Sequence, residues 1–182
     1  MLGRGLLLDR DGVVNHDTAY VGFREQFQFI DGIFDFLRAA QDVGYRLAIL
    51  TNQAGVGRGK YTAEDYYKLT EWMLREFSAQ HVNVELVLGC FEHPDAVLPE
   101  YKRESYWRKP NPGMVLEAIQ KLRLNPSRSV FIGDQLRDLE AAAAGGVAHR
   151  LLLSDTLTPA AGMVRIASYA EAKVFLHKIS TA

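Results

Sequence analysis

Short apolar runs alternate along the chain with longer segments in which apolar residues recur every three or four positions. The uninterrupted runs are typical of strands buried on both faces, and the spaced pattern is typical of amphipathic helices. The predicted strands cover residues 5–8, 46–51, 84–90, 129–134 and 149–153, the last at an edge of the sheet. The predicted helices cover residues 33–43, 62–80, 112–122, 136–144 and 169–178.

This order of elements predicts an α/β fold with a Rossmann-like, mostly parallel sheet and helices on both faces. There is no linker, repeat or low-complexity tract, so residues 1–182 are predicted to form one domain. The segments between elements are short and leave no room for a large cap domain; residues 95–108 are predicted to be an irregular loop. Ligands of such sheets bind beyond the carboxyl ends of the strands.

Composition narrows the classes of partner. The net charge is -1, from 21 basic and 22 acidic residues, which favours neither nucleic acid nor an anionic membrane. The apolar run near the N-terminus is three leucines long, too short for a signal peptide or a membrane span. Cys90 is the single cysteine, which suits a reducing compartment. We therefore expect a cytoplasmic protein, and we expect it to be a monomer.

Polar side chains that suit phosphate chemistry follow three of the predicted strands. Asp9 and Asp11 come directly after the first strand, and two adjacent carboxylates repel each other unless a cation lies between them. Mg²⁺ is the natural partner, and Asp134 could supply a third acid. Thr51 and Asn52 offer a hydroxyl and an amide to phosphoryl oxygens.

Phosphoryl transfer also needs a nucleophile, a proton donor and a positive charge. Asp9 can attack as the nucleophile, Asp11 can act as general acid and base, and Lys109 can neutralise the phosphate.

Each feature also has a plainer interpretation. Asp-x-Asp-Gly alone is often a turn, and Arg108 and Lys109 alone would be ordinary surface charges. The segment 55–60, GVGRGK, lacks the pattern of a P-loop and is predicted to be a flexible loop beside the site, with Arg58 near a ligand. Cys90 and His93 suit a packed thiol and a loop imidazole better than a metal site.

Taken together, four segments resemble the motifs of the haloacid dehalogenase (HAD) superfamily of phosphatases. They are DRDGVVN (9–15), TNQAG (51–55), RKPNPGM (108–114) and GDQLRDLEAA (133–142). Their order and spacing span about residues 5–150. Within the superfamily, the chain resembles the branch that contains heptose 1,7-bisphosphate phosphatases and histidinol-phosphate phosphatases.

The resemblance implies a role for each matching residue. Asp9 would be nucleophile and metal ligand, Asp11 would also offer its backbone carbonyl to the metal, and Asp134 would complete the metal site. Thr51 and Lys109 would bind the transferred phosphoryl group, and Asp138 would orient Lys109 or metal-bound waters. The predicted substrate contacts are Asp17, Tyr20, Asn52, Gln53, Arg58 and Arg108.

Two departures from the family pattern affect these expectations. Relatives in this branch often hold a structural zinc before the RKP segment through several cysteines, but only Cys90 remains here. We therefore expect no structural zinc, and we expect Tyr106 and Trp107 to pack the loop instead. Gln135 stands where bisphosphatases often have a lysine, which weakens the case for a bisphosphate.

The resulting prediction is a Mg²⁺-dependent phosphomonoesterase that forms an aspartyl-phosphate. Its predicted substrate is a small phosphorylated metabolite, D-glycero-D-manno-heptose 1,7-bisphosphate, which would lose its C7 phosphate. Histidinol phosphate or another sugar phosphate remains an alternative substrate. Because the site is predicted to be open, a protein phosphatase also remains possible. The alternative from a different functional class is a non-catalytic phosphate-binding regulatory module.

Overall fold

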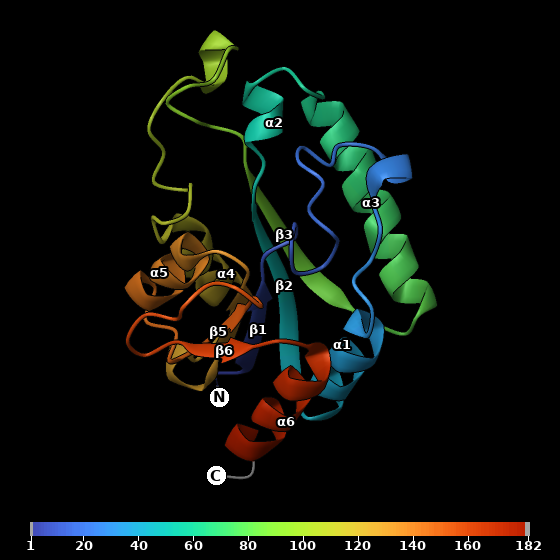
Figure 1. Ribbon diagram of the computed structural model, residues 1–182, viewed down its shortest axis with the longest axis vertical. Helices are drawn as coiled ribbons and strands as arrows, with labels where there is room; N and C mark the ends of the chain where they lie inside the picture. Colours follow the sequence, from blue (N-terminus) through green and yellow to red (C-terminus); the bar gives the residue numbers. More distant parts are fainter. Residues whose placement is uncertain (1, 181–182) are drawn as a thin grey trace.

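The computed structural model describes residues 2–180, so the first residue and the last two of the predicted domain 1–182 lie outside it. Six strands form one sheet in which every pair of neighbours is parallel, in the order β3-β2-β1-β4-β5-β6 (Figure 1). The strands are β1 (Arg4–Leu8), β2 (Tyr45–Asn52), β3 (Val84–Cys90), β4 (Val130–Gly133), β5 (His149–Leu153) and β6 (Val164–Ile166).

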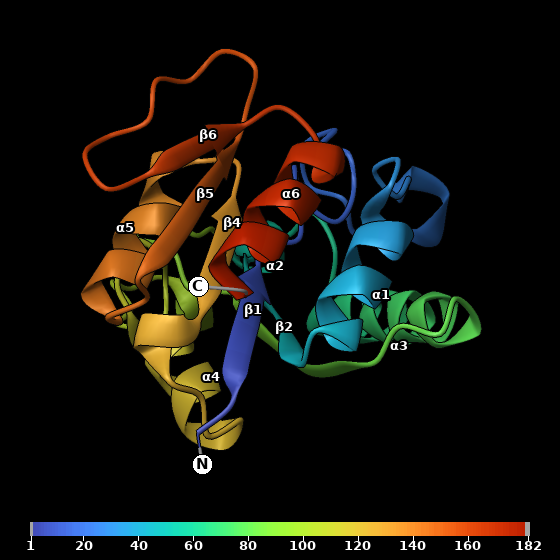
Figure 2. The ribbon, with the colours of Figure 1, turned by 90° about the horizontal axis from the view of Figure 1, so that it is seen from below.

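Helices cover both faces of this sheet, as Figure 2 shows from below. On one face lie α1 (Ile33–Asp42), α3 (Ala63–Ala79) and α6 (Tyr169–Ser180). On the other lie α4 (Gly113–Lys121) and α5 (Leu136–Ala144). Successive side chains of a strand point to opposite faces. Accordingly Leu6 and Leu8 join the core beneath the first three helices, and Leu7 joins the core beneath the other two.

The predicted α/β class is therefore confirmed, with a sheet that is parallel throughout. The segment from the end of β1 to α1 contains one short 3-10 helix, Arg24–Gln26, and the loop after β3 contains another, Pro99–Tyr101. Neither insertion is a large cap domain. No helix within residues 2–180 combines the length and apolar character that a bilayer span requires.

Two predictions about elements were wrong. The strand 149–153 is not at the edge of the sheet, because the three-residue β6 pairs with it. In β6 only Ile166 is buried, and a single buried residue is too weak a pattern to predict a strand. The segment predicted as a flexible loop begins as a short helix, α2 (Ala54–Gly57). Its Val56 is buried, and a Cβ on Gly57 would lie 2.7 Å from the carbonyl oxygen of Phe91, so this turn is packed against the loop after β3.

Tyr106 and Trp107 do not pack the loop after β3 as predicted, since they are 60% and 39% exposed. A polar cluster at the base of the loop takes that place. The thiol of Cys90 lies 3.2 Å from Oε2 of Glu92, whose Oε1 accepts a hydrogen bond of 2.8 Å from Arg103. Burial raises the pKa of Cys90 to about 11, so the thiol is neutral at physiological pH. The expected lack of a structural zinc stays a prediction.

Candidate active site

The sheet order places the carboxyl ends of β2, β1 and β4 side by side. Leu8 pairs with Ile49 and with Ile132, so Asp9 just after β1, Thr51 near the end of β2 and Asp134 just after β4 lie at one edge. A pocket of about 370 Å³ lies there. Every predicted site residue except Lys109 and Asp138 lines it: Asp9, Asp11, Asp17, Tyr20, Thr51, Asn52, Gln53, Arg58, Arg108 and Asp134.

Lys109 lies behind the pocket wall, fully buried next to Asp9. Its Nζ is 2.9 Å from Oδ1 of Asp9 and 2.8 Å from Oδ1 of Asp138, and it donates a hydrogen bond of 2.7 Å to the carbonyl of Leu50. These three acceptors match the three N–H donors of an ammonium group. Burial works against the charge, but the carboxylates of Asp138 and Asp9 more than offset it and raise the pKa of Lys109.

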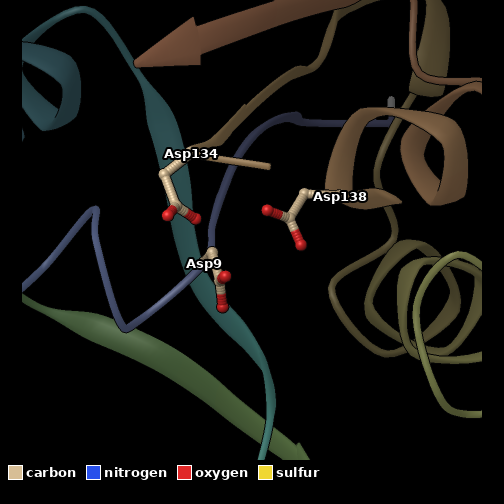
Figure 3. A group of neighbouring side chains, drawn as sticks. All are labelled: Asp9, Asp134 and Asp138. Carbon is tan, nitrogen blue, oxygen red and sulfur yellow. The ribbon is translucent and has the colours of Figure 1, made fainter. Parts of the chain in front are cut away.

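Three carboxylates, whose side chains Figure 3 shows, form a group next to Lys109, and two of them contact it. Oxygens of Asp9, Asp134 and Asp138 all lie within 4.8 Å of one another. Burial raises the pKa of Asp9 to about 7; Lys109 opposes this shift, and the neighbouring acids Asp138 and Asp134 add to it. Burial also raises the pKa of Asp134 to about 6. Hard oxygen donors crowded together in this way fit a divalent cation, whose charge would favour their ionised forms.

The three carboxylates differ in how many of their oxygen atoms already contact other protein groups. Asp138 contacts Lys109 through Oδ1 and accepts a hydrogen bond from the backbone N–H of Gln135 through Oδ2. Asp134 accepts one hydrogen bond of 2.9 Å, from the side-chain amide of Gln135. Asp9 and Asp134 are therefore better placed than Asp138 to bind a cation directly, and Asp138 serves mainly to hold Lys109.

Gly12 explains how the chain turns beneath Asp134. Its φ of +80° lies in the left-handed region, which side chains disfavour. A Cβ at this position would lie 2.4 Å from Oδ2 of Asp134. The glycine of the DRDG segment is therefore required both by the backbone and by the close approach of a carboxylate of the site.

Asp11 lies in the pocket, but its side chain is outside the carboxylate group formed by the described residues. Its carboxylate accepts hydrogen bonds from the guanidinium of Arg10 at 3.0–3.2 Å, from Asn15 at 3.0 Å and from Gln53 at 2.8 Å. It keeps 22% of its side chain exposed. The carboxyl group is thus anchored on several sides yet still accessible to a ligand, as a general acid must be.

The predicted substrate residues differ in how free they are. The side-chain amide of Asn52 is occupied, because it donates to the carbonyl of Lys109 and accepts from its N–H, both at 3.0 Å. Asp17 accepts a hydrogen bond from the backbone N–H of Ala19. Asn52 therefore holds the segment that carries Lys109. The motif comparison alone did not indicate this role for Asn52.

A chain of polar contacts borders the pocket mouth. Nη1 of Arg58 donates to the hydroxyl of Tyr20 at 2.8 Å, and Nη2 lies 3.3 Å from Nε2 of His93. Nη1 of Arg108 and Nε of Arg58 are buried without a hydrogen-bond partner among residues 2–180. Burial, together with the guanidinium groups of Arg137 and Arg58, lowers the pKa of Arg108. The three arginines all line the pocket, so this side of it suits an anion.

Sequence reasoning missed four residues of the site: Arg10, Tyr61, His93 and Arg137. Arg10 stands inside the first motif, and its place between two catalytic candidates was a usable signal. The others come to the pocket from a turn, a loop and the first turn of α5. Nothing local in the sequence distinguishes them from surface residues.

Known proteins resemble this chain over most of its length. The haloacid dehalogenase-like hydrolase family model matches residues 4–146. A D-glycero-α-D-manno-heptose-1,7-bisphosphate 7-phosphatase of Burkholderia mallei is 43% identical over 155 residues, which are 85% of this chain and 82% of that protein. The corresponding β-anomer phosphatase of Vibrio cholerae is 40% identical over 148 residues, covering 81% of this chain and 80% of that protein.

The chain belongs to the haloacid dehalogenase-like hydrolase family. The resemblance inferred from the four motifs is therefore confirmed. A protein from Mesorhizobium loti described as a HAD-like phosphatase has a similar structure, with a TM-score of 0.89 and 29% identity, over 99% of this chain and 87% of that one. The D,D-heptose 1,7-bisphosphate phosphatase of B. bronchiseptica, complexed with magnesium and phosphate, has a TM-score of 0.84 at 24% identity, over 96% and 98%.

Proposed function

We propose that this hydrolase is a Mg²⁺-dependent phosphatase that removes the 7-phosphate of a heptose 1,7-bisphosphate through an aspartyl-phosphate at Asp9. The observation that carries the proposal is the grouping of Asp9, Asp134 and Lys109 at one edge of the sheet. The relatives that act on this sugar support the choice of substrate.

In the first chemical step, a carboxylate oxygen of Asp9 attacks the phosphorus of the 7-phosphate. The bond between phosphorus and the sugar oxygen breaks, and Asp11 gives a proton to that leaving oxygen. Oδ1 of Asp9 already accepts from Lys109 and from the backbone N–H of Arg10, which leaves Oδ2 without a donor among the described residues. One carboxylate oxygen is thus fixed while the other is available.

In the second step, water attacks the phosphorus of the aspartyl-phosphate and Asp11 takes the proton of that water. The bond between phosphorus and Asp9 breaks, so phosphate leaves and both carboxyl groups return to their starting states. Thr51 binds a phosphoryl oxygen during both steps, and the buried Lys109 supplies positive charge beside Asp9, 2.9 Å from its Oδ1. Bound Mg²⁺, held by Asp9, Asp134 and the backbone carbonyl of Asp11, would supply positive charge that offsets the charge of the phosphoryl group.

The second phosphate of the sugar suits the arginine side of the pocket. Arg58, Arg108 and Arg137 line the same pocket as Asp9, and two of them carry buried nitrogen atoms without a partner among residues 2–180. Gln135 lacks the charge of the lysine often found at this position, but Arg137 two residues later restores a cation to the pocket. This arrangement favours a bisphosphate over a substrate with one phosphate.

We also propose that the enzyme is a cytoplasmic monomer. The single thiol of Cys90, which is buried and unpaired with any other cysteine, suits the reducing conditions of the cytoplasm. Size-exclusion chromatography with light scattering measures the oligomeric state directly.

Phosphate release tests the proposed substrate and metal. The α and β anomers of heptose 1,7-bisphosphate, histidinol phosphate and fructose 1,6-bisphosphate are assayed separately with Mg²⁺ and with excess chelator. We expect the highest kcat/KM for one of the heptose bisphosphates and loss of turnover in chelator, restored by added Mg²⁺. A preference for histidinol phosphate would contradict the proposed substrate, and full activity in chelator would contradict the proposed dependence on Mg²⁺.

A further inference from the structure

Gln53 was predicted to bind substrate, but its side-chain amide is committed to other groups of the site. The residue is 2% exposed. Its Nε2 donates to Oδ2 of Asp11 at 2.8 Å and to Oγ1 of Thr51 at 2.9 Å, and its Oε1 accepts from the hydroxyl of Tyr61. One amide therefore links the proposed general acid to the proposed phosphoryl-binding hydroxyl.

The chemistry of the partners fixes the direction of these hydrogen bonds. Oδ2 of Asp11 is an acceptor, since it also accepts from the guanidinium of Arg10, so the amide nitrogen must face Asp11 and the amide oxygen must face Tyr61. The second N–H of the amide then donates to Thr51, whose oxygen is the acceptor. Because that oxygen accepts from Gln53, the proton of the Thr51 hydroxyl is free to be donated to a phosphoryl oxygen in the pocket.

Tyr61 is held so that its hydroxyl reaches Gln53. Its ring lies between two glycines: a Cβ on Gly22 would lie 2.3 Å from the ring, and a Cβ on Gly55 would lie 2.4 Å from it. Burial raises the pKa of Tyr61 to about 12, so the phenol keeps its proton at physiological pH and can donate. The two glycines come from the loop after β1 and from α2, which ties both segments to this ring.

We propose that Gln53 and Tyr61 are a pair of positioning residues, which aim the Asp11 carboxyl group and the Thr51 hydroxyl at the reacting phosphate. Tyr61 sets the orientation of the Gln53 amide, and the amide sets the positions of the other two groups. This inference rests on the proposed function and specifies how its acid and its hydroxyl are placed. Gln53 then contributes to the chemical step and little to the recognition of the sugar.

A positioning role has a distinctive dependence on the leaving group. A sugar alkoxide is a poor leaving group and needs the proton of Asp11, whereas p-nitrophenolate leaves without one. Misplacing Asp11 should therefore slow the hydrolysis of a sugar phosphate much more than the release of p-nitrophenol. Because Asp11 also activates water in the second step, aspartyl-phosphate should accumulate when p-nitrophenyl phosphate is the substrate.

The test compares Gln53→Met, which keeps the chain length but removes both donors, with Tyr61→Phe. The matched control is Tyr66→Phe, which removes a buried phenol hydroxyl of the same aromatic cluster that does not contact Gln53. Steady-state kcat and KM are measured with Mg²⁺ for heptose bisphosphate and for p-nitrophenyl phosphate, and the first turnover is followed by absorbance.

We expect Gln53→Met to lower kcat for the sugar roughly 10²-fold, with little change in KM. With p-nitrophenyl phosphate, we expect a burst of p-nitrophenol that approaches one equivalent per enzyme. Tyr61→Phe should change the same quantities in the same direction by a smaller factor, and it serves as the test if Gln53→Met does not fold. Tyr66→Phe should match the wild type.

Two results would overturn the inference while leaving the proposed function intact. The first is a raised KM for the sugar with unchanged kcat, which would make Gln53 a substrate ligand. The second is an unchanged leaving-group dependence in both variants. If Asp11→Asn keeps full turnover on the sugar, the proposed mechanism itself is wrong, and the two failures are thereby distinguished.

Discussion

Asp9→Asn is expected to lower kcat for the sugar phosphate by roughly 10⁴-fold or more, because an amide cannot form the acyl-phosphate. The fold should survive. Asn has the shape of Asp, and the neutral side chain is compatible with a site in which burial raises the pKa of Asp9 to about 7. Phosphate release measures the activity, and thermal unfolding confirms that the variant is folded.

The control for this substitution is Asp35→Asn. Asp35 is an exposed acid on α1 that pairs with Arg38, and such surface pairs contribute little. Both turnover and unfolding temperature should stay near those of the wild type. If Asp9→Asn instead retains turnover within tenfold of the wild type, water attacks the phosphate directly and Asp9 serves only as a metal ligand.

Lys109→Met should destabilise the protein by about 3–5 kcal/mol as well as abolish turnover. The ammonium group lies between the buried carboxylates of Asp9 and Asp138, and its removal leaves two unpaired acids in the interior. Urea unfolding in chelator measures the free energy of unfolding without any contribution from bound metal. Lys121→Met is the matched control, since Lys121 is half-exposed in an i,i+4 pair and should change stability by less than about 0.5 kcal/mol.

A double variant shows whether unpaired charge is the cause. Lys109→Met combined with Asp138→Asn should be more stable than Lys109→Met alone, because it removes one of the two stranded acids. Equal unfolding midpoints for the wild type and Lys109→Met would contradict the account. In that case Lys109 would contribute nothing to the stability of the carboxylate group.

Local signals in the sequence predicted most of the fold. The start of α3 is an example: the N–H of Asp65 donates to the hydroxyl of Thr62, and the N–H of Thr62 donates back to the carboxylate, a reciprocal pairing that the Thr-x-x-Asp spacing favours at a helix start. Local patterns did not predict β6, because this strand has only three residues and one buried side chain. Its place is set by pairing with β5, which no local pattern encodes.

The centre of the site was predictable because topology alone brings the ends of β1, β2 and β4 together. The contacts at the periphery of the site could not be predicted from the sequence. The links from Arg58 to Tyr20 and His93 join three segments that are far apart in the sequence. Gln53 was placed among the substrate ligands because its motif resembles that of the family, yet its partners depend on a tyrosine eight residues later. Tertiary contacts decided both cases.

The covalent intermediate is the central claim, and trapping it tests that claim most directly. Enzyme in excess is mixed with heptose bisphosphate and Mg²⁺, denatured within the first turnover, and reduced with borohydride, which converts an acyl-phosphate to an alcohol. Peptide mass spectrometry then locates the modified residue. The mechanism predicts homoserine at position 9, absent when substrate is omitted. An unmodified Asp9 after a complete turnover, or modification of Asp11 or Asp134 instead, would contradict it.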